Sequence, residues 1–146
     1  MDLRLKNSCF VVTGSSSGFG RAIAEQLLSE GADVIINARG EEKLEELHKK
    51  FPEQTSVLAG DITTDAVISD LIRMVHGSVI NAGGPPAKSF IHTEITDWDN
   101  AYEKILRWKV KLTQELLEKF REQKYGRIVY IESASVRQNI KNMILR

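Results

Sequence analysis

A chain of 146 residues has the length of one domain and can bury about two-thirds of the surface that its unfolded form exposes. Its 20 basic and 20 acidic residues balance, which argues against a nucleic-acid-binding protein and against a polybasic membrane anchor. No apolar run reaches the length of a membrane span, and the N-terminus lacks the apolar core of a signal peptide. One cysteine excludes an internal disulfide, and the three scattered histidines lack metal-ligand spacing. We therefore expect a cytoplasmic protein without a metal and with Cys9 buried and inert.

Strand and helix patterns alternate along the chain. Short apolar runs predict strands at residues 9–12, 34–37, 56–59, 78–80 and 127–132. Helical patterns fall at residues 21–30, 41–51, 66–75 and 97–123. Short apolar runs as strands are typical of a parallel sheet that helices cover on both faces. The alternation predicts an α/β fold over residues 1–146, a doubly wound, Rossmann-like parallel sheet with about five strands and right-handed crossovers.

The segment between the first strand and the first helix, residues 13–20, reads TGSSSGFG. Gly14 and Gly18 let the backbone take tight dihedral angles close to a phosphate, and Gly20 lets the helix pack closely on the strand. The start of that helix presents unpaired N–H groups to an anion. Strand, turn and helix in this order predict a cradle for a dinucleotide pyrophosphate; a loop that binds nothing is the alternative. The cofactor-binding residues predicted in the turn are Gly14, Ser16, Ser17, Gly18, Phe19 and Gly20.

The helical pattern at 97–123 carries an apolar stripe at helical spacing, which we expect to face the core. The stripe comprises Trp98, Ala101, Tyr102, Ile105, Leu112, Leu116 and Phe120. Lys109 falls inside the stripe, which is unusual for a charged residue. Trp108 falls outside it, so the pattern predicts an exposed Trp108 that is available for a subunit contact.

Four segments, in this order and over nearly the whole chain, resemble motifs of the short-chain dehydrogenases/reductases. TGSSSGFG looks like the family's TGxxxGxG, and Asp61 after the third strand looks like its adenine-contacting acid. NAGG at 81–84 is similar to the family's NNAG segment, and GRIVYIES at 126–133 to the strand that carries the active-site serine. The resemblance implies hydride transfer between a nicotinamide cofactor and a small carbonyl or alcohol substrate.

The resemblance also implies roles for particular residues. It adds to the cofactor contacts Asp61, Ile62, Asn81, Ala82 and Gly83. It makes Ser133 the catalytic residue that holds the carbonyl oxygen. A serine at a strand end with only structural hydrogen bonds is the alternative for Ser133.

The choice between the two nicotinamide cofactors depends on the end of the second strand. NAD-dependent members of the family place an acid there, whereas this chain has Ala38 followed by Arg39. A guanidinium suits the additional phosphate of NADP, so NADP(H) is expected over NAD(H). Many NADP-using members also have a basic residue in the glycine turn, where this chain has Ser17. A solvated surface arginine is the alternative for Arg39.

The chain departs from the family pattern at its other catalytic positions. The asparagine position falls on Ile105, whose side chain cannot bind a relay water. The tyrosine position falls on Arg146, which cannot act as a general acid, and the lysine position lies beyond the chain. We therefore expect a dinucleotide-binding domain that is incomplete at its C-terminus and has at most trace activity. The alternatives are a non-catalytic dinucleotide-binding module and a truncated remnant.

The same comparison predicts a bare sheet edge. The family's sheet continues through two more parallel strands, so the apolar run RIVYI at 127–131 is expected to lie uncovered. Exposed strand edges invite pairing with another chain. A homo-oligomer, formed through this edge or through the long helix, is the expected assembly.

Overall fold

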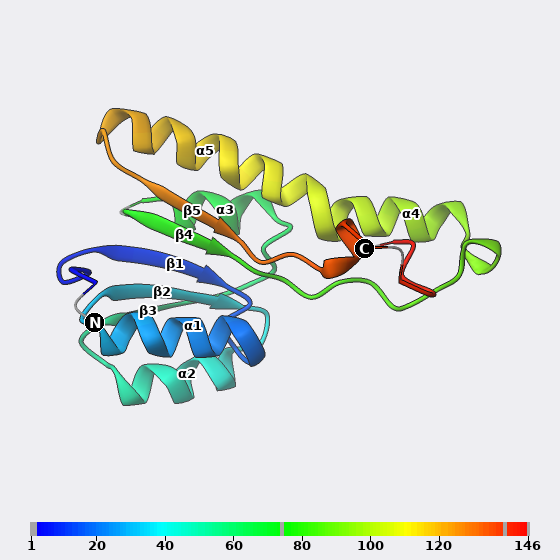
Figure 1. The fold of residues 1–146 in the computed structure, drawn as a ribbon. Coiled ribbons are helices and arrows are strands. Elements are labelled where there is room, and N and C mark those ends of the chain that lie inside the picture. The colour runs from blue at the N-terminus through cyan, green and yellow to red at the C-terminus, as the bar shows by residue number, and fades with distance from the viewer. Residues whose placement is uncertain (1–2, 74, 139, 146) are drawn as a thin grey trace.

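The computed structural model describes residues 3–73, 75–138 and 140–145, which form one sheet of five parallel strands (Figure 1). The strands are β1 (Cys9–Thr13), β2 (Asp33–Ala38), β3 (Thr55–Ala59), β4 (Gly77–Ile80) and β5 (Arg127–Tyr130). Their order across the sheet is β3-β2-β1-β4-β5. The predicted doubly wound, Rossmann-like fold is confirmed. Because the chain leaves β1 toward β3 and later returns to its other side, the carboxyl ends of β1 and β4 border the crevice where such sheets bind ligands.

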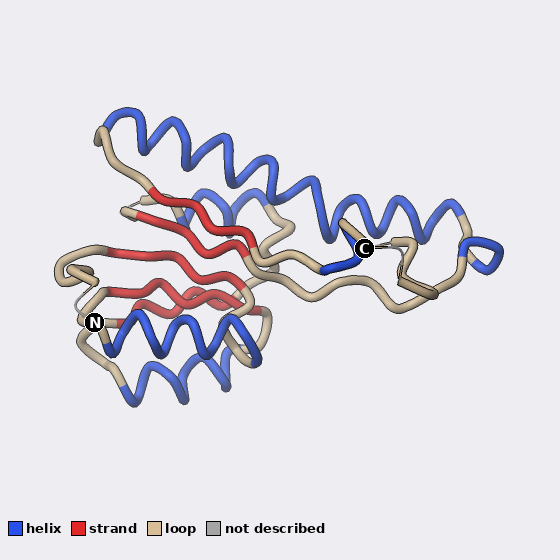
Figure 2. The backbone as a smooth tube through the Cα atoms, in the orientation of Figure 1, coloured by secondary structure: helices blue, strands red, loops and turns tan. Residues whose placement is uncertain are grey.

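Helices cover both faces of this sheet, as Figure 1 shows. On one face lie α1 (Gly18–Ser29) and α2 (Glu41–Lys50), and on the other lie α3 (Asp65–Leu71) and α5 (Trp108–Glu122). Before α5 come α4 (Ile95–Ala101) and the π-helical segment η2 (Tyr102–Arg107). Figure 2 shows α4, η2 and α5 as one continuous helix whose first half projects beyond the carboxyl edge of the sheet. No helix in the described part of the chain is both long and apolar enough to cross a bilayer.

Two apolar cores hold the layers together. The core beneath α3 and α5 includes Val11, Ile68, Leu71, Ile80, Trp108, Leu112, Leu116 and Phe120. The core beneath α1 and α2 includes Val12, Ala24, Leu28, Val34, Ile36, Leu44, Leu47 and Val79. Neighbouring residues Val11 and Val12 thus enter opposite cores, because side chains alternate between the faces of a strand. Burying each large aliphatic side chain stabilises the fold by roughly 1.5–3 kcal/mol.

The apolar stripe of the long helix differs from its predicted form. Trp98 and Tyr102 are 38% and 54% exposed, whereas Trp108 is 1% exposed. The prediction of an exposed Trp108 is therefore wrong. The widened π turn at 102–107 rotates the first half of the helix relative to α5, which shifts the register of the stripe. That first half also has no sheet beneath it (Figure 2), and of the stripe residues that it carries only Ala101 is buried.

Lys109 is buried on this helix and has a charged partner. It is 8% exposed, and its ammonium forms an ion pair with Glu132, just beyond β5. The pair explains how a lysine occupies a core-facing position, since a buried charge requires a partner. It also ties α5 to the end of the outermost strand.

Ser78 is a buried polar residue whose hydroxyl lacks a partner. It lies in β4, is 2% exposed, and its Oγ makes no hydrogen bond to any described residue. We expect Ser78→Ala to raise the free energy of unfolding by about 1 kcal/mol, because an unsatisfied buried hydroxyl is removed. Urea denaturation measures the change, with Ser69→Ala on the exposed face of α3 as the control. A lower midpoint for Ser78→Ala would show that the hydroxyl is satisfied.

Candidate functional site

A cleft of about 740 Å³ lies at the carboxyl ends of the strands. The turn between β1 and α1 forms one wall, and the segments after β2, β3 and β4 form the others. Ten of the predicted site residues line it: Gly14, Ser16, Ser17, Phe19, Arg39, Asp61, Ile62, Asn81, Ala82 and Gly83. Residues from four separate parts of the sequence thus meet in one cavity, at the place where a doubly wound sheet binds its ligand.

The glycine turn is shaped so that a larger residue would not fit. Gly14 has a φ of +65°, and a Cβ there would lie 2.7 Å from the Asn81 carbonyl oxygen. A Cβ on Gly20 would lie 2.3 Å from the Gly14 carbonyl oxygen. The turn is therefore folded tightly onto itself and onto the end of β4. No side chain caps the N-terminus of α1, so its first N–H groups remain available to an anion.

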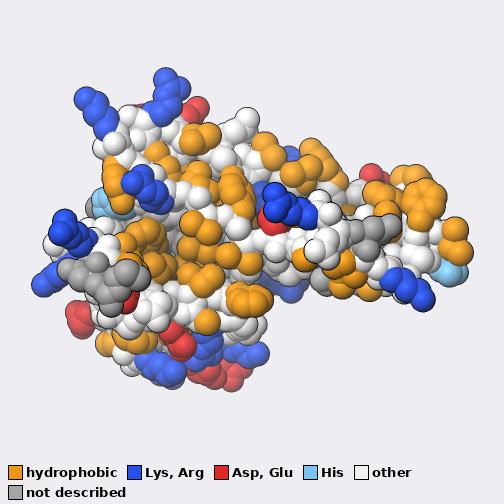
Figure 3. All heavy atoms as spheres, in the orientation of Figure 1, with side chains coloured by type: hydrophobic (Ala, Val, Ile, Leu, Met, Phe, Trp, Pro, Cys, Tyr) orange, Lys and Arg blue, Asp and Glu red, His pale blue; other side chains and the backbone are white. Residues whose placement is uncertain are grey.

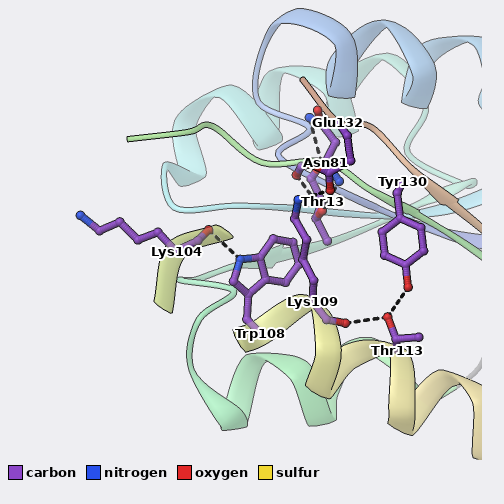
Figure 4. Close-up of polar contacts among 8 residues, drawn as sticks. All are labelled: Thr13, Asn81, Lys104, Trp108, Lys109, Thr113, Tyr130 and Glu132. Carbon is purple, nitrogen blue, oxygen red and sulfur yellow. Dashed lines mark hydrogen bonds and ion pairs between the residues drawn. The ribbon is translucent and has the colours of Figure 1, made fainter. Parts of the chain in front are cut away.

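Thr13 and Asn81 lock the ends of β1 and β4 together (Figure 4). Thr13 Oγ1 donates to the Asn81 carbonyl oxygen at 2.7 Å and accepts from the Asn81 backbone N–H at 2.9 Å. Asn81 Nδ2 also donates to the Thr13 carbonyl oxygen at 3.4 Å. These bonds hold the segment that starts at Asn81 along the cleft. No sequence pattern indicated this role of Thr13, although the residue begins the glycine motif.

Asp61 is held as a carboxylate at the end of the cleft near β3. Its Oδ1 accepts from the backbone N–H and from the hydroxyl of Thr63, both at 2.9 Å. These bonds lower the pKa of Asp61, and the charges of Arg39 and Lys104 lower it further. An ionised carboxylate at this place can accept a hydrogen bond from an amino group such as that of adenine.

The structure does not bring the predicted catalytic residue into this cleft. Ser133 follows β5, and its Oγ accepts from the backbone N–H of Ser135 at 3.2 Å and from the hydroxyl of Ser135 at 2.8 Å. Ile105, at the predicted asparagine position, lies in η2. Arg146, at the predicted tyrosine position, lies outside the described residues. Of these positions, those that the structure describes, Ser133 and Ile105, do not line the cleft.

Some residues that line the cleft were not predicted from the sequence, and two of them come from the long helix. Glu103 and Lys104 reach it from η2, where the long helix passes over the carboxyl edge of the sheet. Their local sequence resembles any charged helix surface, so no pattern indicated a site. Only the path of the helix places them there.

A second hollow, of about 750 Å³, runs along the outer face of η2 and α5. It is lined by side chains of that one helix, including Tyr102, Leu106, Val110 and Leu117. It has no strand ends and no open helix N-terminus, so it lacks the groups that bind a dinucleotide. We interpret it as a strip of open surface.

Other reactive groups are few in the part of the structure that is described. Cys9 is half-buried, and burial, assisted by the charge of Asp33, raises the pKa of its thiol to about 11. The thiol is therefore protonated and unreactive at neutral pH. Within residues 3–73, 75–138 and 140–145, no three His, Cys, Asp or Glu side chains are grouped to hold a metal ion.

Comparison with known proteins identifies the family of this chain. The family model for short chain dehydrogenases matches residues 8–145. The chain belongs to the short-chain dehydrogenase family. Among curated relatives of this short-chain dehydrogenase, a 3-oxoacyl-[acyl-carrier-protein] reductase from Aquifex aeolicus is 31% identical over 144 residues, which cover 91% of this chain and 58% of that protein. The chain spans between 53% and 60% of the length of curated relatives that it matches.

Two solved structures show which cofactors similar short-chain dehydrogenases bind. L-Sorbose reductase from Gluconobacter frateurii, complexed with NADPH and L-sorbose, is 28% identical with a TM-score of 0.89, over 99% of this chain and 59% of that one. A 7α-hydroxysteroid dehydrogenase, complexed with NADH, is 26% identical with a TM-score of 0.88, over 97% of this chain and 59% of that one. Similar folds in this family therefore serve both nicotinamide cofactors.

Proposed function

We propose that this chain is the dinucleotide-binding domain of an NADP(H)-dependent oxidoreductase that acts on a small carbonyl or alcohol substrate. The observation that carries the proposal is the cleft, in which the glycine turn, the uncapped start of α1, Asp61 and Arg39 converge. A cytoplasmic location belongs to the same proposal, because a chain with one protonated thiol suits a reducing compartment.

The residues present fit a dinucleotide, each with its own role. The turn from Gly14 and the N-terminus of α1 would hold the pyrophosphate, since N–H groups and the helix dipole favour an anion. Asp61 would accept the adenine amino group, and the segment from Asn81 would lie along the rest of the cofactor. A bound nicotinamide would supply or accept the hydride. Arg39, at the end of β2, would bind the additional phosphate of NADP(H).

The Arg39→Ala variant tests this choice of cofactor. We expect wild-type protein to bind NADPH more tightly than NADH, and Arg39→Ala to weaken NADPH binding about 10- to 100-fold because a charge-assisted hydrogen bond is lost. Binding of NADH should change little. Isothermal titration calorimetry with both cofactors measures the difference, and Arg121→Ala, on the exposed end of α5, is the matched control. Equal affinities of the wild type for NADPH and NADH would contradict the proposal.

The proposal also includes a limit on turnover by the chain alone. Ile105 cannot bind a relay water, and Ser133 is bonded within its own turn. The general acid of the family is a tyrosine, and its position here is Arg146, which cannot donate the proton. Loss of a general acid lowers a rate about 10²–10⁴-fold, so we expect at most trace oxidation of NADPH. A panel of ketones and aldehydes measures it, with Ser133→Ala as the comparison. Turnover that survives Ser133→Ala would place any catalysis elsewhere.

We further propose that the protein forms a homo-oligomer through the long helix. Four large side chains line the hollow on the outer face of η2 and α5 and are 49–54% exposed: Tyr102, Leu106, Val110 and Leu117. A second bare apolar area includes Val129 of β5, which is 51% exposed. In Figure 3, apolar side chains gather over β4 and β5, beside the part of the sheet that α1 and α2 cover. Contiguous apolar surface of this kind marks interaction sites.

Sedimentation velocity of charge variants distinguishes these surfaces. We expect the wild type to sediment as an oligomer and Leu106→Glu to sediment as a monomer, because a buried charge without a partner opposes association. Ile91→Glu, on an exposed turn away from the hollow along η2 and α5, should leave the assembly intact. Dissociation by Val129→Glu alone would assign the interface to the sheet edge, and a monomeric wild type would refute the assembly.

A further inference from the structure

Lys104 occupies an unusual place on the long helix. Four side chains that face the sheet follow one another at four-residue spacing: Phe120, Leu116, Leu112 and Trp108. Lys104 comes about one turn before Trp108, in η2, the part of the helix that lies at the carboxyl edge of the sheet. It therefore lies over the cleft and lines it together with Arg39 and Asp61.

The backbone of Lys104 is anchored while its side chain is free. The indole N–H of Trp108 donates to the Lys104 carbonyl oxygen at 2.8 Å, and Trp108 itself is buried. Figure 4 shows the Lys104 side chain extended away from Trp108, with its ammonium at the end. Lys104 lies within the π-helical segment η2, and π turns occur frequently at functional sites.

The acidic residues of the cleft have bonded partners, whereas its basic side chains have none in the described part of the chain. Asp61 accepts two hydrogen bonds from Thr63, and Glu103 Oε2 lies 3.4 Å from Nη1 of Arg107. The side chains of Arg39 and Lys104 form no hydrogen bond or ion pair with any residue that the structure describes. Both lie near enough to Asp61 to lower its pKa. Two free cations thus approach the same end of the cleft, one from β2 and one from η2.

We infer that Lys104 is a second phosphate-binding residue, which together with Arg39 holds the phosphate monoester on the adenosine ribose of NADP(H). The inference rests on the proposed function, because it concerns the same cofactor cleft. Two converging cations without partners suit a doubly charged phosphate better than either cation alone. Lysine contributes a point charge on a long, flexible stem, so Lys104 can reach from η2 to a phosphate that Arg39 binds from the end of β2.

Two small nucleotides separate this role from general attraction of anions. We expect Lys104→Met to weaken binding of 2′,5′-ADP about 10-fold, and binding of 5′-AMP less than about twofold, in isothermal titration calorimetry. Lys104→Arg should retain most of the affinity. Lys43→Met, an exposed lysine of α2, is the control for loss of one positive charge. If both cations hold one phosphate, the double variant Arg39→Ala with Lys104→Met should weaken binding of 2′,5′-ADP by a smaller factor than the product of the factors for the two single variants.

The remaining outcomes of these titrations reject either the role of Lys104 or the proposed function. Equal losses of 2′,5′-ADP and 5′-AMP would show that Lys104 attracts nucleotides in general and not the ribose phosphate. A loss with Arg39→Ala but none with Lys104→Met would reject the inference and leave the proposed function standing. A wild type that binds neither nucleotide nor NADPH would reject the proposed function itself. Melting temperatures of all variants show whether any loss comes from unfolding.

Discussion

Gly20→Ala, next to the cleft, should weaken dinucleotide binding more than any single substitution of a residue that lines it, by about 100-fold or more. A Cβ at this position would lie 2.3 Å from the Gly14 carbonyl oxygen and 2.8 Å from Asn81 Nδ2. Neither backbone nor amide can yield without moving α1 away from β1, because Asn81 is itself bonded to Thr13. Overpacking of this kind costs about 1–3 kcal/mol of stability. It also separates the start of α1 from the turn, and the proposed pyrophosphate site uses both.

Calorimetry with NADPH and urea denaturation together measure the two effects of Gly20→Ala. Gly40→Ala is the matched control, because Gly40 also lines the cleft, but a Cβ there meets nothing within 4 Å and its φ of −94° suits any residue. We expect the control to change affinity less than about threefold, within the range of ordinary surface substitutions. If Gly20→Ala bound NADPH as tightly as the wild type, the pyrophosphate could not lie at this turn.

Trp108→Ala should be the most destabilising substitution in the long helix, with a loss of about 3–5 kcal/mol in the free energy of unfolding. Trp108 is 1% exposed in the core between the sheet and α5, and its indole N–H is bonded to the carbonyl of Lys104. Its removal leaves a cavity and deletes the hydrogen bond to the Lys104 carbonyl. We expect Lys104 to lose its fixed position as well, so affinity for NADPH should fall along with stability.

Trp98→Ala is the matched control for that experiment, because the helix contains a second tryptophan in a different environment. Trp98 is 38% exposed and lies in α4, beyond the sheet. Its contacts are an edge-to-face packing with Phe90 and a hydrogen bond to Thr93. We expect a loss of about 1 kcal/mol, typical of a partly exposed site. A larger loss from Trp98→Ala than from Trp108→Ala, in urea denaturation, would restore the predicted stripe and contradict the structure.

The order of strands and helices could be predicted because each depends on local patterns. The apolar runs became β1 to β5 with boundaries shifted by one or two residues, and the doubly wound topology follows from alternation and crossover handedness. The cleft residues around Gly14 were predictable for the same reason, since a motif of eight residues specifies turn, helix start and close packing together. Asp61 and Asn81 were expected from the resemblance to family motifs, and the structure places both at strand ends, where a parallel sheet gathers its ligand-binding groups.

The long helix shows why the rest could not be predicted. Helical spacing assigns a face only while the helix keeps one period, and the π turn at 102–107 changes that period within the stripe. Spacing also does not tell where the sheet beneath ends. Trp108 and Tyr102 therefore exchanged their expected environments, and the burial of Lys109 depended on Glu132, a residue 23 positions away.

The sequence by itself determined the class of fold and the glycine cradle, because alternating apolar runs and a glycine turn act through short-range backbone geometry. The tertiary structure alone decided which side chains share the cleft. It directs Lys104 over the cleft beside Arg39, and it leaves Ser133 bonded within its own turn. The physical reason is the projection of one helix past the edge of the sheet, which depends on contacts between residues far apart in the chain.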